Sequence, residues 1–192
     1  PHRHRGVSGH RVHILGASGT GCSTLGRALA DHLGSQAFDV DDFYWRPSDP
    51  PFADKRPIRE RLALMEQMFL PRSDWVLSGS CTGWGDVIVP RLTHVIFLTM
   101  PAGRRLARLR RRERRRFGRA IEPGGHRAEA FRSFLDWAMS YDDPVFTGRS
   151  RHLHEAWLAE LDCPVTRLDA AQPLERLTEQ ALAALDPAPA GA

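Results

Sequence analysis

The sequence predicts an α/β fold, with a five-stranded parallel sheet covered by helices on both faces. Short apolar runs rich in β-branched and aromatic residues are typical of buried strands, and they lie at residues 12–15, 37–40, 75–77, 94–98 and 165–168. Between the runs, apolar residues recur at helical spacing, as at Leu25, Leu29 and Leu33. Strands that alternate with amphipathic helices favour a parallel sheet, and the right-handed crossover rule leaves few topologies.

Two further helical patterns cover residues 58–69 and 131–139, where apolar side chains again share one face. In a sheet of this kind the ligand lies at the carboxyl ends of the strands. The motifs that follow the predicted strands are therefore the candidate functional site.

Length and composition fit one domain, because 192 residues with 42% apolar content can build a single core. We expect it to span residues 11–185, between flexible tails at 1–10 and 186–192 that lack periodicity. No run of about 18 apolar residues and no signal-peptide pattern is present, which predicts a cytoplasmic protein without a membrane partner. Cys22, Cys81 and Cys163 are an odd set without metal-type spacing, so we expect free thiols.

A glycine-rich segment, VHILGASGTGCSTLGRALA, runs from the first predicted strand into the first predicted helix. Glycines in such a turn let backbone amides point at an anion, and the helix N-terminus adds partial positive charge. The spacing matches the phosphate-binding pattern G-x-x-x-x-G-K-[ST], except that Cys22 stands where lysine is expected. The predicted ATP-binding residues are Gly16, Ala17, Ser18, Gly19, Thr20, Gly21, Cys22, Ser23 and Thr24.

The same motif assigns separate roles to its last residues. Ser23 supplies the hydroxyl expected on Mg²⁺, and Thr24 can reach a phosphate. The missing lysine normally holds the β- and γ-phosphates, and losing such a charge donor costs about 3 to 4 kcal/mol of barrier. Catalysis therefore needs a cation from elsewhere in the chain, or else it is poor.

The second predicted strand leads into FDVDDFYW, which places Asp41 and Asp42 at the carboxyl edge of the sheet. A carboxylate there can accept a hydroxyl proton or hold Mg²⁺, so Asp41 is both a candidate base and a candidate metal ligand. Asp42 is the adjacent alternative. Both aspartates could instead cap a helix or a turn.

The pattern D-x-F-Y after a phosphate loop resembles uridine kinases and nicotinamide riboside kinases. More broadly, residues 11–185 resemble the adenylate-kinase-like family of nucleoside, nucleotide and small-metabolite kinases. The resemblance implies that Asp41 is the catalytic base for the acceptor hydroxyl, that residues 46–57 form an acceptor-binding insert, and that residues 104–127 form a lid over the nucleotide.

Residues 104–119 hold ten arginines, and lids of the resembled family bring arginines onto the transferring phosphate. The arginines nearest the PGG turn are the candidates, namely Arg112, Arg115 and Arg116 as catalytic residues and Arg119 as a nucleotide ligand. Lys55, the only lysine, and Arg56 are the other candidate substitutes for the missing lysine. The third predicted strand ends without a carboxylate, so Asp86 joins Asp41 and Asp42 as a candidate for holding Mg²⁺.

Aromatic residues emerge beside the predicted site, and Tyr44, Trp45 and Trp84 suit either a flat acceptor or the core. The resulting prediction is an ATP- and Mg²⁺-dependent kinase acting on a nucleoside, a nucleotide or another small metabolite. One alternative is a nucleotide sensor or scaffold that lost catalysis with the lysine. The other is a nucleic-acid-binding protein, which is disfavoured because basic and aromatic residues are not interleaved. The oligomeric state is not indicated by any pattern.

Overall fold

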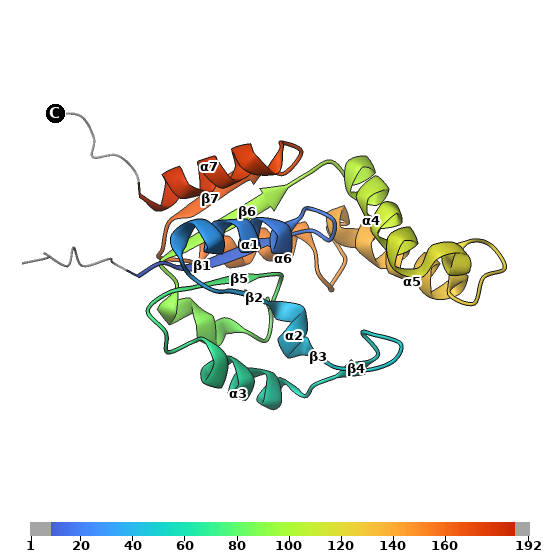
Figure 1. Ribbon diagram of the computed structural model, residues 1–192, viewed down its shortest axis with the longest axis horizontal. Helices are drawn as coiled ribbons and strands as arrows, with labels where there is room; N and C mark the ends of the chain where they lie inside the picture. The colour runs from blue at the N-terminus through green and yellow to red at the C-terminus, as the bar shows by residue number, and fades with distance from the viewer. Residues whose placement is uncertain (1–8, 187–192) are drawn as a thin grey trace, which may run out of the picture.

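A five-stranded parallel sheet runs through the centre of the protein, whose computed structural model describes residues 9–186 (Figure 1). Its strands are β1 (Arg11–Gly16), β2 (Ala37–Asp39), β5 (Trp75–Ser78), β6 (His94–Thr99) and β7 (Val165–Asp169). They lie in the order β2-β5-β1-β6-β7, and every neighbouring pair is parallel. The five predicted strands and the parallel sheet are thereby confirmed.

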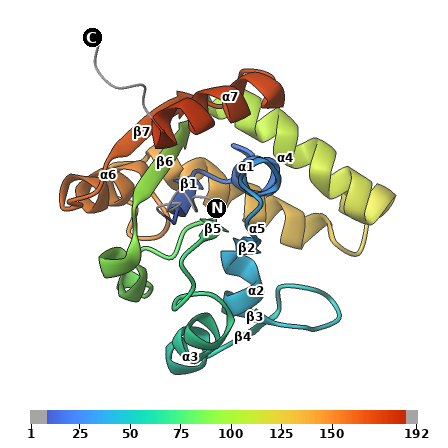
Figure 2. The same cartoon turned by 60° about the vertical axis from the view of Figure 1, so that its left-hand side comes forward.

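Helices cover both faces of the sheet, because each strand buries alternate side chains on opposite sides. On one face Val12 and Ile14 pack with α1 (Cys22–Leu33) and α7 (Leu174–Leu185). On the other face Leu15 packs in a cluster that includes residues of α3 (Ile58–Met68) and α6 (Arg151–Ala159). Figure 2 shows these two layers of helices on either side of the sheet.

The first strand occupies the middle of the sheet, with β5 on one side and β6 on the other. The loop after β1 therefore emerges where the chain order reverses, which is the place where ligands bind in open α/β sheets. A helical turn of 3₁₀ type, η1 (Asp86–Arg91), connects β5 to β6 on the way back across the sheet.

The second strand is one residue shorter than expected. The sequence predicts an end at Val40, whereas β2 ends at Asp39. The Asp39 side chain accepts a hydrogen bond from the Asp41 amide at 2.9 Å and so begins a short helix, α2 (Val40–Tyr44). Capping therefore stops the strand one residue early. A two-stranded antiparallel hairpin follows, made of β3 (Trp45–Arg46) and β4 (Asp54–Lys55), within the insert expected at residues 46–57.

An arm formed by residues 102–139 follows β6 and extends beyond the sheet on the same side as the hairpin (Figure 1). It consists of α4 (Ala102–Phe117), η2 (Gly118–Ile121) and α5 (Ala128–Met139), and η3 (Ser140–Asp142) returns it to the body. The lid expected at residues 104–127 falls within this arm. Its first turns are core, however, since Arg105 is only 1% exposed and Leu109 is buried.

The two ends of the described chain lie together. His10 is buried, its amide donates to Asp74 at 3.1 Å, and its Nε2 lies 3.5 Å from Asp186. Residues 9 and 10 and Asp186 are thus part of the ordered unit, and the remaining tail residues, 1–8 and 187–192, lie outside the described residues. Within residues 9–186, no helix is long and apolar enough to cross a membrane.

Candidate active site

The glycine loop between β1 and α1 adopts a conformation that requires its glycines. Gly19 and Gly21 have φ of 88° and 86°, in the left-handed region that side chains disfavour. A Cβ on Gly19 would also lie 3.0 Å from the carbonyl oxygen of Arg105 and 3.1 Å from Leu109 Cγ. The loop therefore passes directly under α4, and only glycine fits this approach.

Backbone amides of this loop are available to an anion. Among residues 17–24, all of which the structure describes, only the Thr20 amide has a hydrogen-bond acceptor, the Ala17 carbonyl at 3.3 Å. The others surround the N-terminus of α1, which begins at Cys22 without a side-chain cap. Unpaired amides at a helix N-terminus attract anions such as phosphate, so the loop has free donors for one.

Cys22, at the lysine position of the motif, contributes no charge to this site. Its side chain is buried, with Sγ 3.4 Å from the Thr20 hydroxyl. Burial raises the pKa of the Cys22 thiol, so the side chain is neutral at physiological pH. Thr24, the last residue of the motif, is exposed.

Ser23 lies where the motif places it, and its hydroxyl donates a hydrogen bond to a carboxylate oxygen of Asp39. Sequence reasoning missed Asp39, because it assigned the end of β2 to the following residue and looked for the carboxylate at Asp41. The signal that could have identified it is the D-x-D spacing, which puts one aspartate at the strand end and the next in the helix it caps. Ser23 and Asp39 together form an oxygen-rich edge of the phosphate loop.

Asp41 and Asp42 occupy the first turn of α2, where the helix N-terminus favours negative charge. Burial raises the pKa of Asp41 most, and the adjacent Asp39 carboxylate raises it further, while Arg149 and Arg112 lower it. Burial and Asp39 likewise raise the pKa of Asp42. Both aspartates are exposed to solvent, and the charges of two arginines act on Asp41.

Of the predicted arginines of the arm, Arg112 is the one whose charge acts on the candidate base Asp41. Burial and the adjacent Arg116 lower the pKa of Arg112, and Glu113 and Asp41 raise it. Glu113 is buried and holds Arg112 at 3.3 Å and Arg116 at 3.7 Å. The Arg116 guanidinium also lies 5.7 Å from the ring centre of Phe52 in the hairpin, which connects the arm to the insert.

The other predicted cations are placed less closely. Arg56 donates to the carbonyl oxygens of Asp42 and Trp45, at 2.7 and 2.9 Å, and so clamps the backbone of the insert. Lys55 is exposed on β4, and its Nζ lies 5.8 Å from the ring centre of Tyr44. Two more, Arg115 and Arg119, are exposed on the arm. Their predicted roles remain predictions.

Two arginines that the sequence did not single out touch the phosphate loop. Arg149, in the loop before α6, donates from Nε and Nη2 to the carbonyl oxygen of Gly16, at 3.1 and 2.5 Å. An Nη1 atom of Arg108 on α4 lies 3.6 Å from where a Cβ of Gly21 would be. Arg149 is 133 residues from Gly16 in the chain, and no local pattern marks it. Only the packing of α6 and its loop brings it here.

A buried arginine lies between two aromatic rings on the acceptor side. Arg61 of α3 is 7% exposed, and its guanidinium carbon lies 3.9 Å from the Tyr44 ring centre and 5.0 Å from that of Trp84. Its Nε donates to the Arg56 carbonyl at 2.7 Å. Among residues 9–186, no carboxylate pairs with it. Tyr44 and Trp84 thus flank a buried positive charge.

The end of β5 carries hydroxyls where a carboxylate would serve a metal. Ser78 donates to the Phe38 carbonyl at 3.3 Å, and Ser80 lies 2.9 Å from His154 Nε2. Asp86 accepts from Trp157 at 3.2 Å. No group of three or more metal-ligating His, Cys, Asp or Glu side chains exists within the described part of the chain. A Mg²⁺ ion at Ser23 and Asp39 would therefore take its other ligands from phosphate and water, as this ion commonly does.

Comparison with known proteins places this geometry in context. No protein-family model matches the chain. Over 158 residues it is 44% identical to the uncharacterized protein YqaC of Bacillus subtilis (strain 168), a match that covers 82% of this chain and 87% of YqaC. The chain belongs to the YqaC family.

Solved structures extend the likeness from the YqaC family to the kinase fold. Shikimate kinase from Aquifex aeolicus superposes with a TM-score of 0.53 at 13% identity, covering 92% of this chain and 96% of that one. Shikimate kinase from Acinetobacter baumannii gives 0.53 at 14%, with 92% of both chains covered. Both are P-loop kinases of the adenylate-kinase-like fold, so the predicted fold class is confirmed.

Proposed function

We propose that the protein is an ATP-dependent kinase that transfers the γ-phosphate to a hydroxyl or phosphate group of a small molecule. The observation that carries the proposal is the placement of Asp41, whose amide donates to the same Asp39 carboxylate that binds Ser23 of the phosphate loop; the charges of Arg149 and Arg112 also act on Asp41. A loop with free amides, next to a base that has no cation nearby, would suit nucleotide binding without phosphoryl transfer. Guanidinium groups near that base also supply stabilisation for a transferring phosphoryl group.

In the proposed reaction Asp41 accepts the proton of the acceptor hydroxyl. A raised pKa suits this role, because a base whose pKa approaches the working pH transfers protons more efficiently than a strongly acidic one. In this proposal the amides of residues 17–23 orient the phosphates, and Arg112, whose charge acts on Asp41, stabilises the transferring group. Asp42, whose pKa is also raised, remains the alternative base.

Mg²⁺ is part of the proposal, and Ser23 and Asp39 are the residues that would hold it, directly or through water. When bound, the ion would neutralise charge on the β- and γ-phosphate oxygens. The sequence-based assignment of Asp41 as a metal ligand stands as the alternative to Asp39. The two groups are already positioned for an ion, since the Ser23 hydroxyl and the Asp39 carboxylate are hydrogen-bonded to each other.

Arg61 narrows the class of acceptor that we propose. A buried guanidinium costs free energy unless an anion pairs with it, and the described chain offers Arg61 only a backbone carbonyl. Tyr44 lies one helical turn from Asp41, so both side chains share a face of α2. We therefore infer an acceptor that carries a carboxylate or phosphate held by Arg61, with its reacting hydroxyl toward Asp41.

The proposal is tested by measuring ADP release from Mg-ATP against a panel of hydroxylated metabolites, half of them anionic and half neutral. We expect turnover with an anionic compound that Asp41→Asn abolishes while ATP affinity is retained. Asp31→Asn, at an exposed residue of α1, serves as a surface control for the variant. Turnover that survives in Asp41→Asn and disappears in Asp42→Asn would move the base by one residue. Turnover confined to neutral acceptors would refute the assignment of Arg61.

One observation favours a second function, a nucleotide sensor without phosphoryl transfer. The neutral, buried Cys22 thiol removes the charge that the motif normally provides. A sensor would bind ATP and release no ADP with any acceptor in the panel. The same measurement therefore separates the two functions.

A further inference from the structure

We propose that Arg149 is the phosphate-binding cation of this site and takes the place of the lysine that Cys22 replaces. The inference rests on the proposed function, since it assigns a charge to the phosphates of a bound nucleotide. It replaces the candidates that the sequence offered, because Lys55 and Arg56 lie on the insert and Arg56 already binds two backbone carbonyls.

Arg149 lies in contact with the phosphate loop itself. Nε and Nη2 both donate to the Gly16 carbonyl, the first residue of the loop, which leaves the Nη1 donors for a ligand. Its charge also acts on the Cys22 thiol, whose pKa it lowers, and on the Asp41 carboxyl in the same direction. The guanidinium is therefore bound to the first residue of the phosphate loop, and its charge acts on both Cys22 and Asp41.

The helix that follows Arg149 is anchored by a buried histidine. His154, buried on α6, accepts or donates on both ring nitrogens, to Tyr141 and to Ser80 at 2.9 Å each. Burial lowers the pKa of His154 to about 3, so the ring stays neutral and the network keeps one charge state above that pH. A preorganised cation stabilises a phosphate without first being ordered, which is what an electrostatic role requires.

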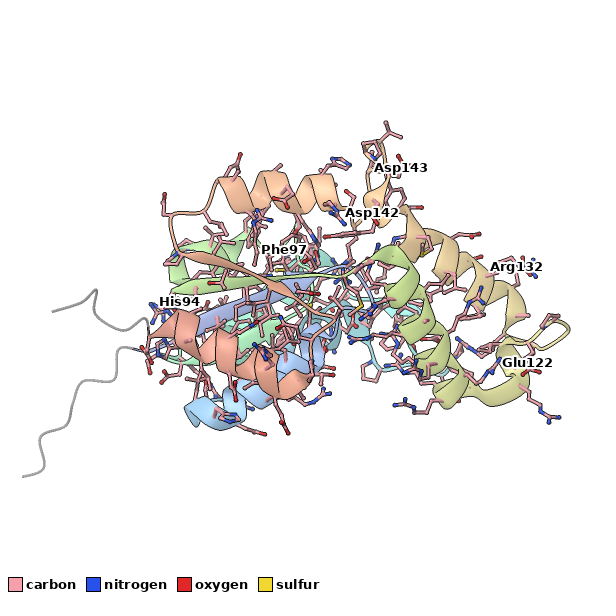
Figure 3. All side chains as sticks on the ribbon, turned by 90° about the horizontal axis from the view of Figure 1, so that it is seen from above. His94, Phe97, Glu122, Arg132, Asp142 and Asp143 are labelled. Atoms are coloured by element: carbon pink, nitrogen blue, oxygen red, sulfur yellow. The ribbon has the colours of Figure 1, made fainter. Side chains whose placement is uncertain are left out.

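Arg149 also differs from its neighbour Arg151 in what it contacts. Arg151 pairs with Asp142 at 2.7 Å, and Asp142 lies where the arm joins the body (Figure 3), where it also binds Arg105. No carboxylate pairs with Arg149 among residues 9–186. The charge of Arg149 is therefore available to a ligand, whereas the charge of Arg151 is compensated by Asp142. This difference makes Arg151 a suitable control.

The test measures binding of Mg-ATP, Mg-ADP and AMP by calorimetry, independently of any acceptor. Arg149→Gln removes the charge but keeps an amide donor for the Gly16 carbonyl. We expect it to weaken Mg-ATP binding about 10- to 100-fold, the loss of one charged hydrogen bond, and to change AMP binding less than threefold. Arg151→Ala should leave all three affinities within about threefold.

The deciding variant is Cys22→Lys combined with Arg149→Gln. If Arg149 stands in for the lysine, the new lysine should restore Mg-ATP affinity to within about fivefold of the wild type. Unchanged affinity in Arg149→Gln, or a loss that Cys22→Lys does not restore, would overturn the inference, the latter by showing that the arginine only shapes the loop. Failure of the wild type to bind Mg-ATP at all would instead refute the proposed function. Urea unfolding of each variant confirms that it is folded.

Discussion

Asp39 performs two tasks that two substitutions can separate. Its carboxylate caps α2 through the Asp41 amide and accepts the Ser23 hydroxyl at the phosphate loop. Asparagine caps a helix about as well as aspartate but carries no charge, whereas alanine removes both the cap and the charge. Asp39→Asn therefore tests the charge, and Asp39→Ala adds the loss of the cap.

The structure sets the size of each effect. Losing an N-cap costs about 1 kcal/mol, and losing a hydrogen bond to a charged group costs about 1.5 kcal/mol at the low end, which applies because Ser23 is only half-buried. Removing the repulsion between Asp39 and Asp41 offsets part of this in both variants. We expect Asp39→Ala to lose about 2 kcal/mol, or about 4 to 8 °C in Tm, and Asp39→Asn about half as much.

The assay combines urea unfolding with ATP titrations in the presence and absence of Mg²⁺. Both Asp39 variants should lose most of the gain in affinity that Mg²⁺ provides, about tenfold or more, because the metal loses one carboxylate. Asp31→Asn, a substitution at an exposed residue of α1, provides the control. A full magnesium effect in Asp39→Asn would refute the metal assignment. Equal stability of the asparagine and alanine variants would refute the cap.

Three further expectations follow from single side chains. Asp41→Asn should be more stable than the wild type at pH 7, because burial raises the pKa of Asp41 in the folded protein and stability is lost as pH rises from the unfolded value toward the folded one. The gain should vanish below about pH 4 in urea titrations, and a pH-independent difference would contradict it. Gly19→Ala should lower the free energy of unfolding more than Gly34→Ala does. Both glycines have positive φ, which costs about 1 to 2 kcal/mol for alanine, but only at Gly19 would the added Cβ also collide with neighbouring atoms. Arg61→Met should lose less than about 1 kcal/mol of stability, since no carboxylate pairs with it, while acceptor KM rises about tenfold or more; a large stability loss would make the arginine structural.

The elements of the sheet could be predicted because each depends on a local pattern. Five apolar runs, each bounded by polar or turn residues, correspond to the five strands. The error at the end of β2 has a local cause as well, since Val40 continues the apolar run while Asp39 stops the strand by capping α2. Hydrophobicity alone does not register a side-chain cap. The burial of Arg105 at the start of the expected lid has a similar cause, because its charge gives no sign in the sequence of the pairing with Asp142 at 2.7 Å.

The site was predictable where a motif defines it and not where tertiary packing does. The glycine loop and Ser23 follow from spacing along one segment, and Asp41 follows from its place after the second strand. Arg149 and Arg61 have no such signal, because an isolated arginine in a chain with 27 basic residues carries no mark of its surroundings. What distinguishes Arg61 is burial without a carboxylate, and what distinguishes Arg149 is contact with Gly16. Both properties arise only when distant segments pack.

The arginine-rich helix α4 has one face that packs on the protein and another that is exposed to solvent. Arg105, Leu109 and Arg112 recur at steps of four and three residues and therefore share one face. Along this face, Arg105 and Leu109 are buried, and both lie against Gly19 of the phosphate loop. Further along the same face, the charge of Arg112 acts on Asp41. The remaining arginines of the helix are largely exposed, which explains why composition alone suggested a nucleic-acid surface. The helix thus contacts the phosphate loop at its base, and further along it carries Arg112, whose charge acts on Asp41. Any shift of α4 that follows nucleotide binding would move Arg112 relative to Asp41, so the helix couples the two halves of the proposed reaction.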